Sequence, residues 1–279
     1  MKMNKYDAFE SAIFLRSREF FLAILFFVTI FLIYEISLRK IATGAEEDVK
    51  KQGLRVLKLD NKTTTDAELG EITLNYPDLV ELTLGGTKIT DAGLDHLVRL
   101  KKLRKIRLSK TAITDAAGVK LAKISTLQDI DVSQTAFGDV GLAALKSLTK
   151  LKRLNLYLTN VTDAGTGKIK DYDFVKTLTW LNLDLCEISD AGASALVGIE
   201  NLEWLHLGGT DVTDAIADDL TKFKKLKDII VTKTPVTKNG ADNLRKKLPN
   251  CKIQDNISNN ITEEEIKQAK ELRKKISKK

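Results

Sequence analysis

The stretch LVELTLGGTKITDAGL, residues 79–94, decides the fold because its pattern recurs along the chain. Further copies begin at Leu103, Leu127, Leu151, Leu178, Leu202 and Leu226, and a weaker first copy begins at Leu54. From Leu79 onward the starts are 24 residues apart, except that three residues are added between Leu151 and Leu178. Eight copies in register predict repeats that stack on one another, so the repeat must be interpreted before any single motif.

Each unit begins with the pattern LxxLxLxxT, in which Leu occupies positions 4 and 6 and positions 3 and 5 face the other way. Alternation with period two predicts a short strand whose Leu side chains point into a shared core. The Thr at position 9 is short and polar, and we expect its hydroxyl to bond the backbone of the neighbouring turn. This Thr recurs as Thr87, Thr111, Thr135, Thr159, Thr210 and Thr234.

The ITDAGL segment of each unit predicts the start of a helix. The N-cap residues are Thr90, Thr114, Thr162, Ser189 and Thr213, and they are followed by Asp91, Asp115, Asp163, Asp190 and Asp214. An Asp in the first turn is favoured there by the helix dipole. A metal-binding or acid–base array is disfavoured, because every Asp has this capping reason and no copy adds a second ligand beside it.

These units resemble the bacterial leucine-rich repeat family whose units read close to LxxLxLxxTxITDAGLxxLxxL, which is itself similar to the repeats of F-box adaptor proteins. The resemblance implies an α/β fold, a right-handed leucine-rich repeat solenoid with a concave parallel sheet and convex helices. LPNCKI, residues 248–253, looks like the half-strand that often closes members of this family. The resemblance implies little about the ligand, since such solenoids are mostly protein-binding scaffolds.

An apolar stretch precedes the repeats. Residues 20–34, FFLAILFFVTIFLIY, carry no charge, and with the following EISL the stretch approaches the ~20 residues that a spanning helix needs. A signal-peptide core and a buried helix are the alternatives, and a cut at residues 42–44 stays open, although Arg39 and Lys40 disfavour cleavage. We therefore expect a single-pass membrane anchor from Phe20 to Leu38, with the repeats on the non-cytoplasmic side.

The expected organisation has five parts. They are an N-terminal segment (1–19), the transmembrane anchor (20–38), a linker and cap (39–53), the solenoid (54–253) and a charged amphipathic tail (254–279). In the tail, Thr262 and Glu265 stand in capping-box relation before an apolar stripe. We expect a helix that packs on the last repeat, lies on an anionic membrane or stays mobile. The added residues of segment 165–178 predict a surface insertion that exposes Tyr172 and Asp173.

Charge and cysteine content exclude some classes of function. The net charge of +7 is spread along the chain, so a surface dedicated to nucleic acid is not expected. Cys186 and Cys251 would lie more than two strand spacings apart, too far for a disulfide, and both are expected to be reduced and structural.

Function has to be sought on the concave face, at positions 3, 5, 7 and 8 of each unit. Trp180 and Trp204 hold the same position on neighbouring strands, and Leu158 and Leu185 are expected to extend their surface. Exposed Trp side chains are typical of interface hot spots, although burial under a loop or mutual stacking is the alternative. We assign partner binding to Arg153, Asn155, Tyr157, Trp180, Asn182, Asp184, Trp204 and His206.

A secondary basic patch on the same face comprises Lys105, Arg107 and Lys110. Because equal positions on adjacent strands are neighbours, we expect Lys105 to pair with Asp129 and Arg107 with Asp131. Arg99, Lys101, Lys102 and Arg104 also make the nearby strand entrance basic, which leaves an acidic partner or a phosphate-rich surface open.

No pattern in the chain predicts catalysis. His206 has no Cys, His or carboxylate pair at ligand spacing, and the Gly-Gly pairs lack the GK[ST] of a phosphate-binding loop. We therefore expect no enzyme activity, no metal and no cofactor. The expected function is a membrane-anchored scaffold for a protein or peptide partner. A glycan or cell-envelope binder remains an alternative, as does a ubiquitin-ligase substrate adaptor, although the apolar stretch stands where an F-box-like segment would be needed.

Overall fold

The computed structural model describes residues 56–59, 63–256 and 262–276. The chain divides into two compact units, Met1–Lys51 and Gln52–Lys279, and all of the described residues belong to the second. The predicted anchor at Phe20 to Leu38 and the predicted linker lie outside the described residues. Among the helices that are described, none is long and apolar enough to cross a membrane. The anchor therefore stays a prediction.

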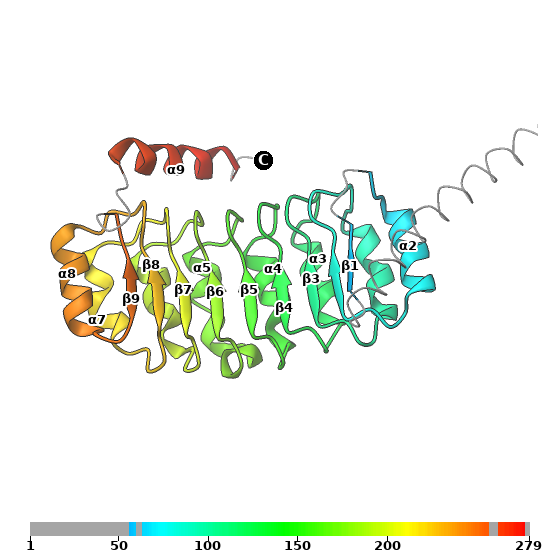
Figure 1. Ribbon diagram of the computed structural model, residues 1–279, viewed down its shortest axis with the longest axis horizontal. Helices are drawn as coiled ribbons and strands as arrows, with labels where there is room; N and C mark the ends of the chain where they lie inside the picture. Colours follow the sequence, from blue (N-terminus) through cyan, green and yellow to red (C-terminus); the bar gives the residue numbers. More distant parts are fainter. Residues whose placement is uncertain (1–55, 60–62, 257–261, 277–279) are drawn as a thin grey trace, which may run out of the picture. The chain divides into compact units, whose positions relative to one another are not determined.

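In the described part of the chain, short strands form one nine-stranded parallel sheet, with neighbours in sheet order equal to neighbours in chain order (Figure 1). The strands are β1 (Val56–Lys58), β2 (Glu81–Thr83), β3 (Lys105–Arg107), β4 (Asp129–Asp131), β5 (Arg153–Asn155), β6 (Trp180–Asn182), β7 (Trp204–His206), β8 (Asp228–Ile230) and β9 (Lys252–Gln254). Each repeat supplies one strand, and β9 lies where the sequence predicts the closing half-strand.

Short helices cover one face of this sheet and leave the other face open (Figure 1). The α-helices are α2 (Asp66–Asn75), α3 (Ala116–Ala122), α4 (Asp139–Ala144), α5 (Asp163–Thr166), α6 (Asp190–Ala195), α7 (Ala217–Leu220), α8 (Lys238–Lys247) and α9 (Glu263–Ile276). The 3-10 helices are η1 (Ala92–Arg99), η2 (Leu145–Ser147), η3 (Ile169–Asp171), η4 (Asp173–Lys176), η5 (Leu196–Gly198) and η6 (Asp214–Ile216). We call the helix-free side the open face.

The core lies between the sheet and the helices. Leu154 and Leu156, at positions 4 and 6 of their repeat, are completely buried, as are Leu181 and Leu183 in the next repeat. The strand residues on either side of Leu154 are more exposed, as the alternation predicts, whereas Asn182 beside Leu181 is buried. The strands therefore form where the sequence places them, because burying the apolar side chains of every repeat against the next supplies most of the stabilisation.

The Thr residues at position 9 bond the backbone, but not that of the neighbouring turn. Thr87 Oγ1 donates to the carbonyl of Leu84 at 2.6 Å, and Thr159 Oγ1 donates to that of Leu156 at 2.8 Å. Each acceptor lies three residues back in the same turn, so the expected contact between repeats was wrong. Cys186 takes this position in its repeat, and its Sγ does reach the preceding repeat, 3.0 Å from the Leu156 carbonyl. Neither Cys186 nor Cys251 forms a disulfide.

The Asp that begins each helix joins adjacent repeats. Asp139 accepts hydrogen bonds from the backbone nitrogen and the hydroxyl of Thr162 at 2.8 and 2.7 Å, and Asp190 does the same with Thr213 at 2.7 Å each. The same pairing links Asp66 to Thr90, Asp91 to Thr114, Asp163 to Ser189 and Asp214 to Thr237. Besides its place in the first turn, the Asp therefore fixes the cap of the next helix, which sequence reasoning missed.

The Gly of the TDAG motif makes room for this contact. A Cβ atom at Gly165 would clash with the carboxylate of Asp139 from the preceding repeat, and one at Gly192 would clash with that of Asp163. The motif therefore requires Gly for the close approach of the neighbouring repeat, not for an unusual backbone angle.

The insertion after α5 folds as η3 and η4. Asp173 is exposed as predicted, but Tyr172 is buried and packs edge-on against Phe174, with ring centroids 5.5 Å apart. The expectation that the insertion exposes Tyr172 was therefore wrong. The added residues contribute an aromatic pair to the core, because the burial of large aromatic rings stabilises the folded state.

Candidate partner-binding face

The open face brings the predicted aromatic residues together on β5, β6 and β7. Arg153 pairs with Trp180, and Trp180 pairs with Trp204, at equal positions of parallel strands. Asn155, Asn182 and His206 form the next row in the same register. Both Trp side chains are half-buried.

Cationic side chains cover the two Trp rings. The guanidinium carbon of Arg153 lies 4.3 Å from the centroid of the Trp180 ring, and His206 meets that ring edge-on with centroids 5.1 Å apart. Lys227 Nζ lies 5.4 Å from the centroid of the Trp204 ring. Among the described residues the two Trp rings do not stack on each other, and these contacts contribute to their partial burial. Lys227 lies just before β8 and was not among the predicted site residues.

The charged residues of the adjacent strands pair only partly as predicted, because Arg107 does contact Asp131 but Lys105 does not pair with Asp129. Lys105 Nζ lies 3.4 Å from Glu81 on β2 instead of pairing with Asp129. Arg107 donates two hydrogen bonds to Asp129 at 2.7 and 2.8 Å and lies only within 4.0 Å of its register partner Asp131. The long guanidinium side chain reaches diagonally across the strands, and a bidentate contact with one carboxylate adds geometric specificity as well as energy.

Asp129 links the two predicted patches. Besides the pair with Arg107, it lies 3.7 Å from Nε of Arg153, the residue that covers Trp180. Lys110, the third member of the basic patch, is exposed and has a positive φ of 57° in the turn after β3. The basic patch is therefore largely neutralised by its own carboxylates, and Lys110 is set apart from it in the turn.

Several residues that we predicted to face a partner instead form hydrogen bonds within the domain. Asn182 is only 8% exposed, and its Oδ1 accepts a hydrogen bond from the backbone nitrogen of Asp184 at 2.7 Å. Asn155 holds the next turn in the same way, accepting from the nitrogen of Tyr157 at 3.2 Å. Asn and Asp favour such turns because the side chain replaces a backbone acceptor. The expectation that Asn182 faces solvent was wrong.

Leu158 and Leu185 also differ from the prediction. They are 4% and 8% exposed, and they form a small apolar cluster against which Tyr157 packs. Both have a positive φ, 53° and 59°, in the turns that follow β5 and β6. An apolar side chain in this conformation is unusual, so packing has overridden the local backbone preference. They support Tyr157 instead of presenting apolar surface to a partner.

Asp184 and His206 lie close together on this face, and burial shifts the pKa of each. Asp184 accepts a hydrogen bond from the nitrogen of Gly208 at 2.5 Å, and its other oxygen lies 3.8 Å from Nδ1 of His206. Burial raises the pKa of Asp184 to about 7, against the lowering effects of the Gly208 hydrogen bond and Lys233. Burial lowers the pKa of His206. Both groups therefore favour their neutral forms more than they would in water.

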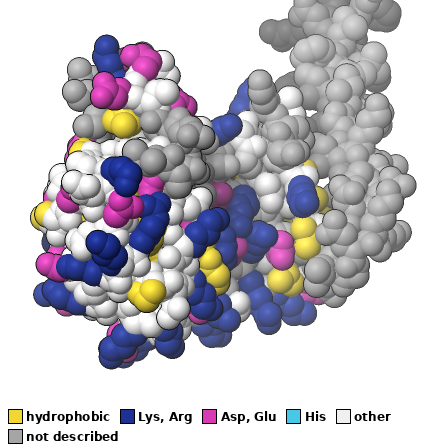
Figure 2. All heavy atoms as spheres, turned by 60° about the vertical axis from the view of Figure 1, so that its left-hand side comes forward, with side chains coloured by type: hydrophobic (Ala, Val, Ile, Leu, Met, Phe, Trp, Pro, Cys, Tyr) yellow, Lys and Arg dark blue, Asp and Glu magenta, His cyan; other side chains and the backbone are white. Residues whose placement is uncertain are grey.

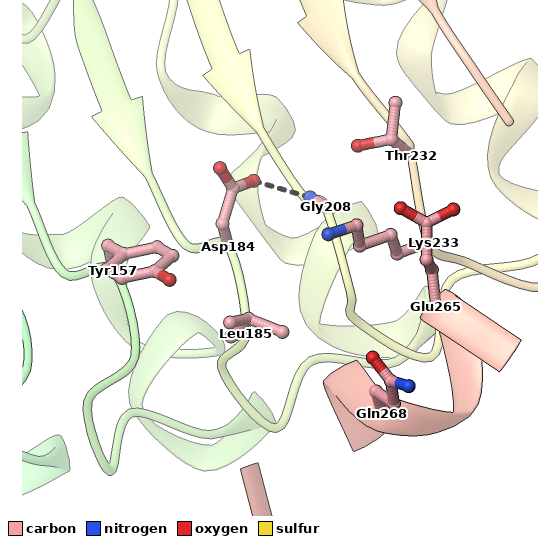
Figure 3. A pocket seen from close by; sticks show the side chains of 8 residues that line it. All are labelled: Tyr157, Asp184, Leu185, Gly208, Thr232, Lys233, Glu265 and Gln268. Carbon is pink, nitrogen blue, oxygen red and sulfur yellow. Dashed lines mark hydrogen bonds between the residues drawn. The ribbon is translucent and has the colours of Figure 1, made fainter. Parts of the chain in front are cut away.

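A cavity of about 360 Å³ opens at the end of this face, where Asp184 meets the C-terminal helix (Figure 3). It is lined by Tyr157, Asp184, Leu185, Gly208, Thr232, Lys233, Glu265 and Gln268. In Figure 3 the Lys233 side chain lies between the carboxylates of Asp184 and Glu265. The sequence predicts the capping box of α9, and Thr262 and Glu265 do form it. Only the structure shows that Glu265 and Gln268 return to the edge of the sheet.

Among the described residues, no three His, Cys, Asp or Glu side chains gather as metal ligands would. The Cys186 thiol is buried, and this burial raises its pKa to about 11, so it stays protonated near neutral pH.

Comparison with known proteins addresses the fold. A family model described as "Leucine Rich repeat" matches residues 123–146 and 176–197. Among solved structures, internalin C2 (inlC2) from Listeria monocytogenes str. 4b F2365 is similar, with a TM-score of 0.51, 20% identity and coverage of 68% of this chain and 76% of that chain. A search of curated proteins gave no match. The stacked strands, the repeated core positions and these similarities together support a fold like that of leucine-rich repeat solenoids.

Proposed function

We propose that this protein is a membrane-anchored, non-enzymatic scaffold that binds a protein or peptide through the open face of β5 to β7. The observation that carries the proposal is the pair of Trp180 and Trp204, which stand in register on adjacent strands of a solvent-facing sheet. The leucine-rich repeat fold supports protein partners in general, because such solenoids present an extended sheet on which neighbouring repeats contribute side chains. The assignment to the type whose 24-residue units read close to LxxLxLxxTxITDAGLxxLxxL is part of this proposal.

A partner could displace the side chains that cover the two Trp rings. Arg153 and Lys227 are long, flexible and exposed, so they can swing aside without disturbing the core. A partner that supplies its own cation or apolar group could then take their place over the rings. Trp and Arg residues that become desolvated in this way each contribute about 2 kcal/mol or more to many interfaces.

Binding is tested with the second compact unit, Gln52–Lys279, which contains the whole described core. The fragment is immobilised and incubated with an envelope extract. The proteins that it retains are compared with those retained by the double variant Trp180→Ala/Trp204→Ala. The matched control is Leu74→Ala/Val119→Ala, which removes two apolar side chains, each 56% exposed, from the helices. Circular dichroism confirms that all three proteins are folded.

A protein retained by the wild type and the control, but lost by the Trp variant, supports the proposal. Equal retention by all three fragments would rule out the aromatic surface as the contact. Loss of retention after the extract is deglycosylated would instead favour a glycan ligand, for which paired Trp rings offer stacking surfaces.

The membrane part of the proposal is tested separately on the full chain. We expect the protein to stay with membranes after an alkaline wash, and to become extractable when residues 20–38 are deleted, because this apolar stretch is near the length of a spanning helix. Protease protection in sealed vesicles then tests whether the repeats lie on the non-cytoplasmic side. Full extraction of the intact chain would contradict the anchor without affecting the partner site.

A further inference from the structure

The two edges of the sheet carry opposite charge. Between α2 and β9, the loops that lead from a helix into a strand hold ten Lys and Arg residues but only three acids, Asp78, Glu200 and Glu203. These loops are residues 76–80, 100–104, 123–128, 148–152, 177–179, 199–203, 221–227 and 248–251. We call this row of loops the basic edge.

The opposite edge, formed by the loops that lead from β2 to β8 into the following helices, is acidic. It holds three lysines, Lys88, Lys110 and Lys233, against five Asp and Glu residues. The acids are Asp91, Asp115, Asp184, Glu187 and Asp211. The separation follows from the stacking, because equal positions of successive repeats lie on the same edge of a parallel sheet.

The basic edge is available to a ligand. All ten of its cationic side chains belong to exposed residues. Two of its three acids form ion pairs within the edge: the carboxylate of Asp78 lies 3.1 Å from Lys102 Nζ, and that of Glu203 lies 2.7 Å from Lys227 Nζ. Among the ion pairs of the described residues, Lys150 and Lys152 appear in none. In Figure 2 dark-blue Lys and Arg side chains are spread along the lower margin, the edge away from α9.

We propose that the basic edge binds a surface of anionic lipid headgroups. Nine of the ten cations are lysines, with Arg104 as the exception, and lysine acts as a mobile point charge, which suits a diffuse layer of phosphates. The cations lie in four of the eight loops. Six of them belong to three successive loops, 100–104, 123–128 and 148–152, whose strands are about 4.8 Å apart, and the other four belong to the loop 221–227, so both groups can lie on one flat surface. The cavity lined by Asp184 belongs to the other edge.

A single-stranded nucleic acid fits the basic edge less well. Such ligands need aromatic platforms on which bases stack. The aromatic residues of these loops are Tyr76, which is half-buried, and Phe223, which is 5% exposed. Trp180 and Trp204 begin the strands that follow two of the loops, but their rings are half-buried and covered by cationic side chains. Phosphate attraction without base stacking points to headgroups.

Binding through this edge would orient the domain. The strands would stand with their carboxyl ends and α9 away from the lipid, and the open face of β5 to β7 would remain uncovered at the side. The inference does not depend on the predicted anchor, since it concerns only residues of the second compact unit.

The test is sedimentation of the Gln52–Lys279 fragment, which lacks the apolar stretch, with vesicles of phosphatidylcholine alone or mixed with phosphatidylglycerol. We expect binding to the mixed vesicles only, and release as ionic strength rises, because exposed charges are screened within about 10 Å at 0.1 M salt. Lys150→Glu/Lys152→Glu should weaken binding roughly tenfold or more.

The matched control is Lys88→Glu/Lys110→Glu, which makes the same change in charge on the opposite edge. It should bind nearly as the wild type does. Equal weakening by both variants would show that only net charge matters and would overturn the proposal. Binding to soluble polyphosphate without binding to the mixed vesicles would overturn it as well.

Discussion

Asp139 in one repeat accepts two hydrogen bonds from Thr162 in the next, at 2.8 Å from the backbone nitrogen and 2.7 Å from the hydroxyl. Thr162 in turn caps its own helix by accepting from the nitrogen of Ala164 at 3.2 Å. The contact therefore couples the start of one helix to the start of the following one. Because a solenoid has no contacts between distant repeats, its cooperativity depends on such nearest-neighbour links.

Removal of this link should destabilise the domain. Asp139→Ala leaves a backbone nitrogen and a hydroxyl without their acceptor, and we expect it to lower the free energy of unfolding by about 1–3 kcal/mol in urea titrations. Glu200→Ala, at an exposed position of a loop, serves as the control and should change it by less than about 0.5 kcal/mol. Equal stability of the two variants would mean that the Asp ladder contributes nothing.

The Gly of the motif should be coupled to this Asp. Gly165→Ala places a Cβ against the Asp139 carboxylate and should cost roughly 1–3 kcal/mol. In the background of Asp139→Ala the clash is relieved, so the same substitution should cost clearly less. A double-mutant cycle measured by urea unfolding checks this. Additive effects would contradict the assigned reason for the Gly.

The Tyr172 hydroxyl should be dispensable. It is buried and has no hydrogen-bond partner among the described residues. Tyr172→Phe removes an unsatisfied polar group and keeps the ring that packs on Phe174, so we expect unchanged stability or a gain of up to about 1 kcal/mol. Tyr172→Ala, which also removes the ring, should cost about 3 kcal/mol or more. A marked loss of stability in Tyr172→Phe would reveal a partner for the hydroxyl.

Asp184 should make the domain less stable as the pH rises. Its pKa is raised from 3.8 to about 7 by burial, so between these values the folded state keeps a proton that the unfolded state has lost. Stability from this group is therefore lost as the pH rises towards 7. Asp184→Asn should gain stability relative to the wild type by roughly 1–2 kcal/mol near pH 8, and by little near pH 4.

The pH experiment compares urea midpoints of the two proteins at each pH. His206, whose pKa burial lowers, is present in both and contributes with the opposite sign, since a His held neutral loses stability as the pH falls. A difference between the proteins that does not change with pH would exclude the titration of Asp184 as its cause.

The covering of the Trp rings can be observed directly, because Trp180 and Trp204 are the two Trp residues of the chain. Arg153→Ala and Lys227→Ala should each uncover one ring, and should raise acrylamide quenching and shift the emission to longer wavelength. Lys152→Ala, at an exposed position beside Arg153, should leave the spectrum unchanged. Identical quenching in all three variants would show that the cations do not cover the rings in solution.

The sequence by itself determined the features that recur with a fixed period. The Leu alternation predicts the strands, TDAG predicts the helix starts, and the repeat length sets the register that brings Trp180 beside Trp204. These predictions succeed because the signal is local and is repeated eight times along the chain. The same period does not predict which side-chain contacts form between adjacent repeats.

Only the tertiary structure decided those contacts. The diagonal reach of Arg107 to Asp129, the burial of Leu158 and Leu185 and the return of Glu265 to the sheet edge depend on side-chain length and on segments far apart in sequence. The distribution of charge over the surface of the domain also depends on the tertiary structure. Ten Lys and Arg residues from loops far apart in sequence lie on one edge, because stacking places equal positions of successive repeats side by side.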